Sequence, residues 1–290
     1  MVEDRAPGPR AGALVLVATP LGNLGDLTRR AREALETADA VYCEDTRRTR
    51  VLFSAYGMAP RGRLRALHEH NEASRVDEVV ARVAAGEVVA LVSDAGTPGI
   101  SDPGSRVVAA VVAAGLDVTT TPGPSAVVAA LSISGLPTDR FVMEGFLPRT
   151  RGARDKLYRA WDTEARTIVF FESPQRVVTT LREIAARSPQ RRVAVARELT
   201  KVHEEVVRGP VGAVADQLAS RETLGEFVVV LDGSPAPAPN PEDLVDALRA
   251  RLDEGLSVRD AVGAVADELG VAHRDAYRVA LTLRSEERGR

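Results

Sequence analysis

The chain has 290 residues, of which 44% are apolar and 27% charged, so it has the size of two compact domains and the composition of an ordinary globular protein. The net charge of −3 gives no overall positive charge for binding nucleic acid, and Cys43, the only cysteine, excludes an internal disulfide and a cysteine-cluster metal site. No stretch resembles a signal peptide or a membrane span, so we expect a cytoplasmic protein that contacts no membrane.

The first part of the chain alternates short apolar strands with helical patterns. Residues 1–12, rich in Pro, Gly and Arg, predict a disordered tail. Strands are then expected at 14–18, 40–43 and 64–67, and helices at 28–38, with Thr28 as N-cap, and at 74–85. The loop at 19–26 contains Gly22 and Gly25 but no G-x-G-x-x-G fingerprint, which makes a nucleotide-dependent dehydrogenase a weak alternative.

The stretch GEVVALVSDAGTPGISDPG, from Gly86 to Gly104, predicts a buried parallel strand, a glycine-rich loop and the start of a helix. A strand at 118–120 follows, then a second such loop at 121–126 and a helix that ends at Ser134. Each strand of this half thus ends in a polar or glycine-rich loop, and in an open parallel sheet ligands bind beyond those ends. The alternative is that these loops are structural βα turns.

The second half predicts another α/β domain, followed by a helical module. Gly135-Leu136-Pro137-Thr138 interrupts the chain, and strands are expected at 141–146, 167–171, 193–196 and 227–231. A proline-rich segment precedes expected helices at 243–254, 257–269 (with Ser257 as N-cap) and 274–284. The predicted domains are 13–136 and 137–233, then a linker at 234–241 and a helical module at 242–290. Because a glycine separates the last two helices, the module either reads RNA as a helix-turn-helix unit or packs on its own domain or a partner subunit.

Several separate motifs, in order over residues 14–232, resemble those of the tetrapyrrole-methylase superfamily. They are P-L-G-N-L-G-D, E-D-T-R, H-E-H-N-E, S-D-A-G-T-P-G-I-S-D-P-G, P-G-P-S-A, E-G-F-L-P-R, E-S-P-Q-R and R-E-L-T-K. Within it the chain resembles the family that 2'-O-methylates a cytidine of 16S rRNA, and H-E-H-N-E and E-D-T-R favour this RNA branch. The resemblance implies two α/β domains of the class III methyltransferase type with a cleft between them, and a homodimer.

The resemblance also implies that S-adenosylmethionine binds in the cleft. The implied contacts are Leu21, Gly22, Ser93, Asp94, Gly96, Thr97, Ser125, Ala126, Phe171 and Glu172. Loops of this kind expose backbone N–H and C=O groups, and Asp94 is able to accept from a ribose hydroxyl or an amino group. The alternative for Asp94 is the side chain of an Asx-turn.

Methylation of a ribose hydroxyl benefits from a general base or a nearby cation. The catalytic candidates are Glu44, Asp45, His70, Glu172 and Lys201, with His68, Glu144 and Glu198 also near loop ends, and the sequence does not choose among them. His68 and His70 have the i, i+2 spacing of one strand face, which suits a metal. Because no third ligand is placed beside them, we expect no metal site.

Two arginine clusters adjoin the motifs, and arginine suits bidentate contact to phosphate. The candidates for RNA binding are Arg47 and Arg48, and Arg149, Arg151 and Arg154 in a predicted basic loop. The expected partner is 16S rRNA in the 30S subunit. A solvated surface or an anionic tetrapyrrole substrate would also explain the clusters. Two other functions therefore stay open: methylation of a corrin or porphyrin precursor, and a non-catalytic RNA-binding role.

Overall fold

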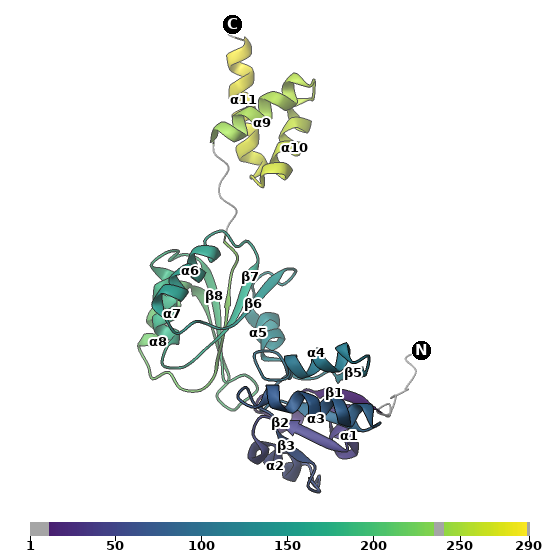
Figure 1. Cartoon of the computed structure of the whole chain (residues 1–290). Coiled ribbons are helices and arrows are strands. Elements are labelled where there is room, and N and C mark those ends of the chain that lie inside the picture. Colours follow the sequence, from purple (N-terminus) through teal and green to yellow (C-terminus); the bar gives the residue numbers. More distant parts are fainter. Residues whose placement is uncertain (1–11, 235–240, 289–290) are drawn as a thin grey trace. The chain divides into compact units, whose positions relative to one another are not determined.

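The computed structural model describes residues 12–234 and 241–288, so almost all of the predicted N-terminal tail and most of the predicted linker lie outside it. Two compact units make up this part of the chain (Figure 1). One comprises the described residues up to Asp155 together with Arg166–Asp232, and the other comprises Lys156–Ala165 together with the described residues from Gly233 onward. The boundaries predicted at 136 and 233 stay predictions.

The first sheet is parallel throughout and has the strand order β3-β2-β4-β1-β5. Its strands are β1 (Ala13–Val17), β2 (Ala40–Cys43), β3 (Leu64–Ala66), β4 (Val88–Val92) and β5 (Asp117–Thr121). All five agree with the expected strands to within a residue or so at each end. β1 continues to β2, on the far side of β4, whereas β4 continues to β5, on the far side of β1. The loops after these two neighbouring strands therefore run in opposite directions, which opens a crevice at the carboxyl edge.

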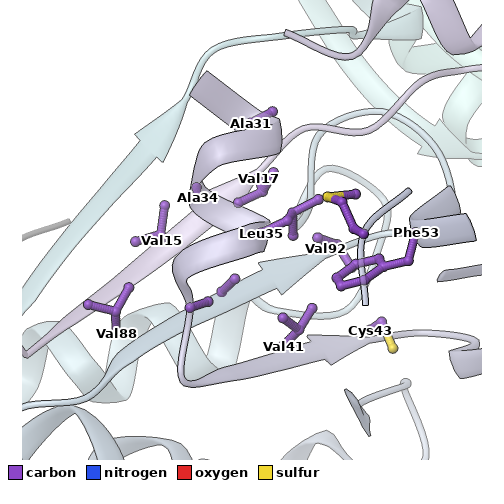
Figure 2. Packing of buried hydrophobic residues seen from close by; sticks show 13 residues of the cluster. Val15, Val17, Ala31, Ala34, Leu35, Val41, Cys43, Phe53, Val88 and Val92 are labelled. Carbon is purple, nitrogen blue, oxygen red and sulfur yellow. The ribbon is translucent and has the colours of Figure 1, made fainter. Parts of the chain in front are cut away.

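Side chains of successive strand residues alternate between the two faces of this sheet, and each face has its own apolar cluster. On one face, Val15 and Val17 of β1 pack with Leu35 of α1 (Arg29–Thr37) and Phe53 of α2 (Thr46–Ala55) (Figure 2). On the other, Leu14 packs with α3 (Glu72–Ala84) and α4 (Ser105–Ala113). Burial of a side chain the size of Leu35 or Phe53 contributes about 1.5–3 kcal/mol, so these clusters hold the strand ends in place.

Local signals in the first sheet's connections behave as the sequence predicts. Thr28 caps α1, its Oγ1 accepting from the backbone N–H of Ala31 at 3.1 Å. Cys43 is fully buried, and burial raises the pKa of its thiol, as expected of an inert cysteine. A short 3₁₀ helix, η1 (Leu24–Asp26), occupies the end of the first glycine loop.

The second sheet is mixed, with the order β6-β7-β10-β8-β9. Its strands are β6 (Phe141–Phe146), β7 (Thr167–Glu172), β8 (Arg192–Arg197), β9 (Glu205–Pro210) and β10 (Phe227–Leu231). Only β6 and β7 are parallel; the other neighbours are antiparallel. The sequence analysis missed β9, an edge strand that pairs with β8 alone.

Helix α5 (Ala126–Ser134) packs on the second sheet, although it follows the last strand of the first. Its Val127 and Leu131 share an apolar cluster with Val169 of β7 and Val228 of β10. Two further helices, α7 (Val177–Ala185) and α8 (Val211–Ala219), lie side by side (Figure 1). The segment 151–161 forms helix α6, so the predicted basic loop at Arg149–Lys156 is wrong beyond residue 150.

The three C-terminal helices have an apolar cluster of their own. They are α9 (Pro241–Asp253), α10 (Val258–Leu269) and α11 (His273–Arg288), close to the expected ranges. Leu248, Val265 and Ala280, one from each helix, are fully buried in this cluster. Ser257 caps α10 as predicted, accepting from the N–H of Asp260 at 3.2 Å.

Candidate active site

The loops at the carboxyl edge of the first sheet are fastened to one another. Thr19, after β1, and Gly96, after β4, exchange two backbone hydrogen bonds of 2.8 and 2.9 Å. The Thr97 hydroxyl donates to the carbonyl of Pro124, after β5, at 3.0 Å. Gly96 has φ +81°, which favours glycine, and a Cβ there would lie 3.2 Å from Leu21 Cδ2. The backbone of three loops thus forms one rigid edge.

A cavity of about 550 Å³ lies beside this edge, within the range of small-molecule sites. The first sheet contributes the loops after β1, β2, β4 and β5, and the second sheet contributes residues of β6, β7 and β10. Eight of the ten residues expected at the cofactor site line it: Leu21, Asp94, Gly96, Thr97, Ser125, Ala126, Phe171 and Glu172. The other two do not: Ser93 donates to the carbonyls of Ala95 and Gly96, and Gly22 packs against the Lys201 side chain.

Three carboxylates from two loops line the cavity: Glu44, after β2, and Asp94 and Asp102, both after β4. Asp94 accepts from the backbone N–H of Asp45 at 3.1 Å and lies 3.3 Å from the Arg48 guanidinium. Burial, and then the charge of Glu44, raises the pKa of Asp102 to about 6. Burial and the charge of Asp94 also raise the pKa of Glu44. The cavity is therefore electronegative and suits a cationic ligand.

Glu172 also lines the cavity, but its oxygens already have partners. Its side chain is 1% exposed and accepts from Ser173 N–H at 2.8 Å, Arg176 at 2.9 Å and the Thr180 hydroxyl at 2.8 Å. A carboxylate held by three donors is fixed in position. This arrangement favours a role in holding the end of β7 over proton transfer.

The remaining catalytic candidates lie outside the cavity lining. Asp45 caps α2 and binds the Arg47 side chain, which lowers the Asp45 pKa to about 2. Lys201 contacts Glu198 at 2.8 Å and Glu226 at 3.1 Å. His70 lies in the turn after β3.

His68 and His70 both lie beyond β3, which ends at Ala66, so their i, i+2 spacing does not place them on one strand face. Their ring centroids are 6.0 Å apart. Within residues 12–234 and 241–288, no group of three His, Cys, Asp or Glu side chains is arranged to hold a metal ion.

The five arginines predicted to bind RNA have different surroundings. Arg48 lines the cavity, and its side chain is 69% exposed. Arg47 is paired with Asp45, and Arg154 is clamped by both oxygens of Glu183 at 2.8 and 2.9 Å. Arg151 is exposed on α6. Among the described residues, no contact of the Arg149 side chain supports or opposes its predicted role in RNA binding. Of these five arginines, Arg48 is the one that lines the cavity.

The sequence analysis missed several lining residues. Asp102 and Ile100 lie in the quoted S-D-A-G-T-P-G-I-S-D-P-G motif, and Phe146 lies in E-G-F-L-P-R, so the motifs carried the signal. Leu199 lies in the quoted R-E-L-T-K motif, whereas Gly225 lies in none of the quoted motifs. The approach of Gly225 to the cavity depends on how the two sheets pack, which no local pattern reveals.

Comparison with known proteins identifies the family. The family Tetrapyrrole (Corrin/Porphyrin) Methylases matches residues 13–215, and the RsmI C-terminal HTH domain matches residues 238–284. The chain is 41% identical over 279 residues to ribosomal RNA small subunit methyltransferase I of Synechocystis sp., covering 95% of this chain and 99% of the relative. The chain belongs to the ribosomal RNA small subunit methyltransferase I family.

A second member of this family, from Mycobacterium tuberculosis (strain CDC 1551 / Oshkosh), is 45% identical over 285 residues, covering 96% of this chain and 98% of the relative. Among solved structures, uroporphyrin-III C-methyl transferase from Thermus thermophilus, complexed with S-adenyl homocysteine, has a TM-score of 0.52 at 21% identity, over 76% of this chain and 96% of that one. This likeness bears out the expected fold class of two α/β halves. None of the described helices has the length and apolar character needed to cross a bilayer.

Proposed function

We propose that this chain is an S-adenosylmethionine-dependent methyltransferase that acts on small-subunit ribosomal RNA, at the 2'-hydroxyl of a cytidine. The observation that carries the proposal is the single cavity lined by eight of the ten residues expected to bind the cofactor. Family membership and the names of the relatives support the ribosomal RNA substrate. The homodimer, the cytoplasmic location and the 30S particle as substrate stay predictions.

The cavity fits this cofactor in charge and in shape. S-adenosylmethionine, when bound, supplies a methyl group on a positively charged sulfonium. Glu44, from the loop after β2, and Asp94 and Asp102, from the loop after β4, provide negative charge. Gly96, which has no side chain, leaves the floor of the cavity open beside Leu21. We assign the adenosine and methionine portions to the loops after β1, β4 and β5, where backbone groups are held at fixed positions.

Methyl transfer to a ribose forms a bond between the 2'-oxygen and the methyl carbon as the sulfur–methyl bond breaks, and the hydroxyl proton must leave. Among the carboxylates of the cavity, Glu172 is held by three donors, Asp94 by Arg48 and Asp45 N–H, and Glu226 by Lys201. Glu44 and Asp102 remain to accept the proton, and Asp102 has the Ser93 hydroxyl as a hydrogen-bond neighbour. Asp102 has the better-matched basicity, because its pKa of about 6 lies near the working pH.

The test is transfer of a labelled methyl group from S-adenosylmethionine to purified 30S particles, followed by nuclease mapping of the labelled nucleotide. We expect label on the ribose of one cytidine. Label on a base would contradict the 2'-O assignment. Label only on a corrin or porphyrin precursor would show that the enzyme is a tetrapyrrole methylase in activity as well as in fold, and no binding of S-adenosylhomocysteine by calorimetry would favour a non-catalytic RNA-binding protein.

A further inference from the structure

One wall of the cavity exposes a large aromatic ring. Phe146, at the end of β6, lines the cavity and is 64% exposed. The register of β6 against β7 shifts between Met143 and Phe146, and Gly145 within this bulge has φ +69°. Bulges redirect side chains and are frequent beside active sites. The backbone therefore departs from regular strand geometry where it presents this ring.

A second apolar side chain reaches the same part of the cavity from the first sheet. Ile100, in the loop after β4, lines the cavity and is 47% exposed. Its neighbour Ser101 has φ +62°, unusual for a residue other than glycine. A Cβ built on Gly145 would lie 3.2 Å from Ser101 Oγ, so the Ile100 loop and the Phe146 bulge meet. Two irregular backbone segments, one from each sheet, thus present two exposed apolar side chains to the same cavity.

The Phe146 ring is supported from within the cavity. Phe171 of β7 packs against it, with ring centroids 5.3 Å apart and planes inclined by 47°. Phe171 fixes one side of the ring, and most of the remaining surface faces solvent. An exposed, oriented aromatic surface at the edge of a ligand cavity is a feature of proteins that bind unpaired bases.

We propose that Phe146, together with Ile100, forms a platform on which the base of the target nucleotide stacks after leaving the RNA stack. This inference rests on the proposed function and specifies how that site takes its substrate. A ribose hydroxyl reaches a cavity of this kind only if its nucleotide turns out of the surrounding RNA, and stacking on a side chain compensates for the lost stacking on neighbouring bases. Arg48, exposed on the same cavity, is placed to contact a flanking phosphate.

The cofactor is a less suitable occupant of this platform. The residues expected to bind it are in the loops after β1, β4 and β5, at the N-terminus of α5 and at Phe171. Phe171 is partly buried, whereas Phe146 is mostly exposed. The partly buried Phe171 ring therefore suits contact with the cofactor, and the exposed Phe146 ring suits contact with the RNA.

The experiment compares Phe146→Ala, Phe146→Trp and Phe141→Ala with the wild-type protein. Phe141 lies on the same strand and is also exposed, at 42%, but does not line the cavity, so it controls for loss of an exposed phenyl ring. The measurements are kcat and KM for 30S particles and calorimetric affinity for S-adenosylhomocysteine. We expect Phe146→Ala to raise KM for 30S about tenfold or more with cofactor affinity unchanged, Phe146→Trp to stay near wild type, and Phe141→Ala to have no effect.

Each other outcome counts against the platform. If Phe146→Ala weakens S-adenosylhomocysteine binding, the ring belongs to the cofactor site and the inference is overturned. If wild-type enzyme methylates 30S and Phe146→Ala does so with the same KM, the inference fails while the proposed function stands. If wild-type enzyme transfers no methyl group to 30S particles, both fail.

Discussion

At the scale of single residues, Asp102 lowers the stability of the folded state at neutral pH and is also the proposed acceptor of the ribose proton. Its folded-state pKa of about 6 lies above the ordinary aspartate value of 3.8, so the folded state holds the proton more tightly than the unfolded state. Stability therefore falls as pH rises from about 4 to 6, and the loss persists at neutral pH. With allowance for solvent screening of this partly buried group, the loss is about 1–2 kcal/mol.

We therefore expect Asp102→Asn to gain about 1–2 kcal/mol of unfolding free energy at pH 7.5, and nothing below pH 4, where Asp102 is protonated in both states. If Asp102 accepts the ribose proton, wild-type kcat should rise with pH around 6, and the variant should be slower and lack this inflection. Urea titrations at the two pH values and a pH–rate profile measure both effects. A variant that is less stable at pH 7.5, or that keeps the inflection, would contradict this account.

Asp45, which lies outside the cavity lining, provides a contrast to Asp102. Arg47 lowers its pKa to about 2, so its contribution to stability is present above about pH 4 and is lost as pH falls through 2. Asp45→Asn should accordingly lower stability at pH 7.5, opposite in sign to Asp102→Asn, and the same urea titrations compare them. The pKa values of these two aspartates thus shift in opposite directions, because Asp45 has a guanidinium partner whereas Asp102 is partly buried and faces the Glu44 carboxylate.

At the scale of elements, Glu72 connects the start of α3 to the start of α4. It is buried, and its Oε1 accepts from the N–H of Gly104 at 2.9 Å and of Arg106 at 3.0 Å. A carboxylate at a helix N-terminus satisfies free N–H groups and interacts favourably with the helix dipole. Because α4 begins where the loop after β4 ends, Glu72 also positions the residues of that loop, Asp94 to Asp102.

We expect Glu72→Ala to cost about 2–3 kcal/mol of unfolding free energy, because it leaves the buried N–H of Gly104 and the partly buried N–H of Arg106 without an acceptor. It should also weaken S-adenosylhomocysteine binding. Glu72→Gln should cost only about 1 kcal/mol, since both bonds end on one oxygen that an amide retains. Glu69, exposed in the same motif, supplies the control: Glu69→Ala should change stability by less than about 0.5 kcal/mol. Urea unfolding measures the stability and calorimetry measures the binding. If Glu72→Ala had the same stability and affinity as Glu69→Ala, the proposed role of Glu72 in positioning the loop after β4 would be contradicted.

The elements that the sequence predicted are those with dense local signals. Apolar runs such as Val88–Val92 are buried on both faces, so a strand was predicted there from composition alone. Strand β9 was missed because it lies at a sheet edge with one neighbour, begins with Glu205 and ends in Gly-Pro, so its composition is less constrained. The charged start of α6 suggested a loop, because arginines on an exposed helical face and in a loop look alike in sequence.

The candidate site was predictable only in part, for a similar reason. Its loops follow strand ends, so the sequence predicted that they would share one edge, and the family resemblance named Asp94, Gly96 and Ser125 within them. A contribution such as that of Gly225, which lies outside the quoted motifs, depends on long-range packing. The local sequence also does not show that Glu172 pairs with Thr180 or that Arg154 pairs with Glu183. These pairings decide which charged side chains already have hydrogen-bond partners.

At the scale of the whole molecule, the cavity and the C-terminal helices depend on different residues. The lining residues fall between Leu21 and Val228, whereas the apolar cluster of α9, α10 and α11 falls between Leu244 and Leu283. Because the cavity lining and this apolar cluster share no residue, we expect removal of the three C-terminal helices to leave the cavity intact. The match of residues 238–284 to a helix-turn-helix domain suggests that these helices contribute to RNA binding rather than to cofactor binding.

We expect a chain lacking Pro241–Arg290 to bind S-adenosylhomocysteine within about twofold of the full-length affinity, but to methylate 30S particles with a raised KM. Contacts to phosphates release counterions, so if the C-terminal helices supply some of them, the truncated chain should also lose part of the salt dependence of RNA binding. Calorimetry and 30S binding between 50 and 200 mM salt measure the two effects separately. Loss of cofactor binding would mean that these helices support the cavity, and an unchanged KM and salt dependence would mean that they pack without touching RNA.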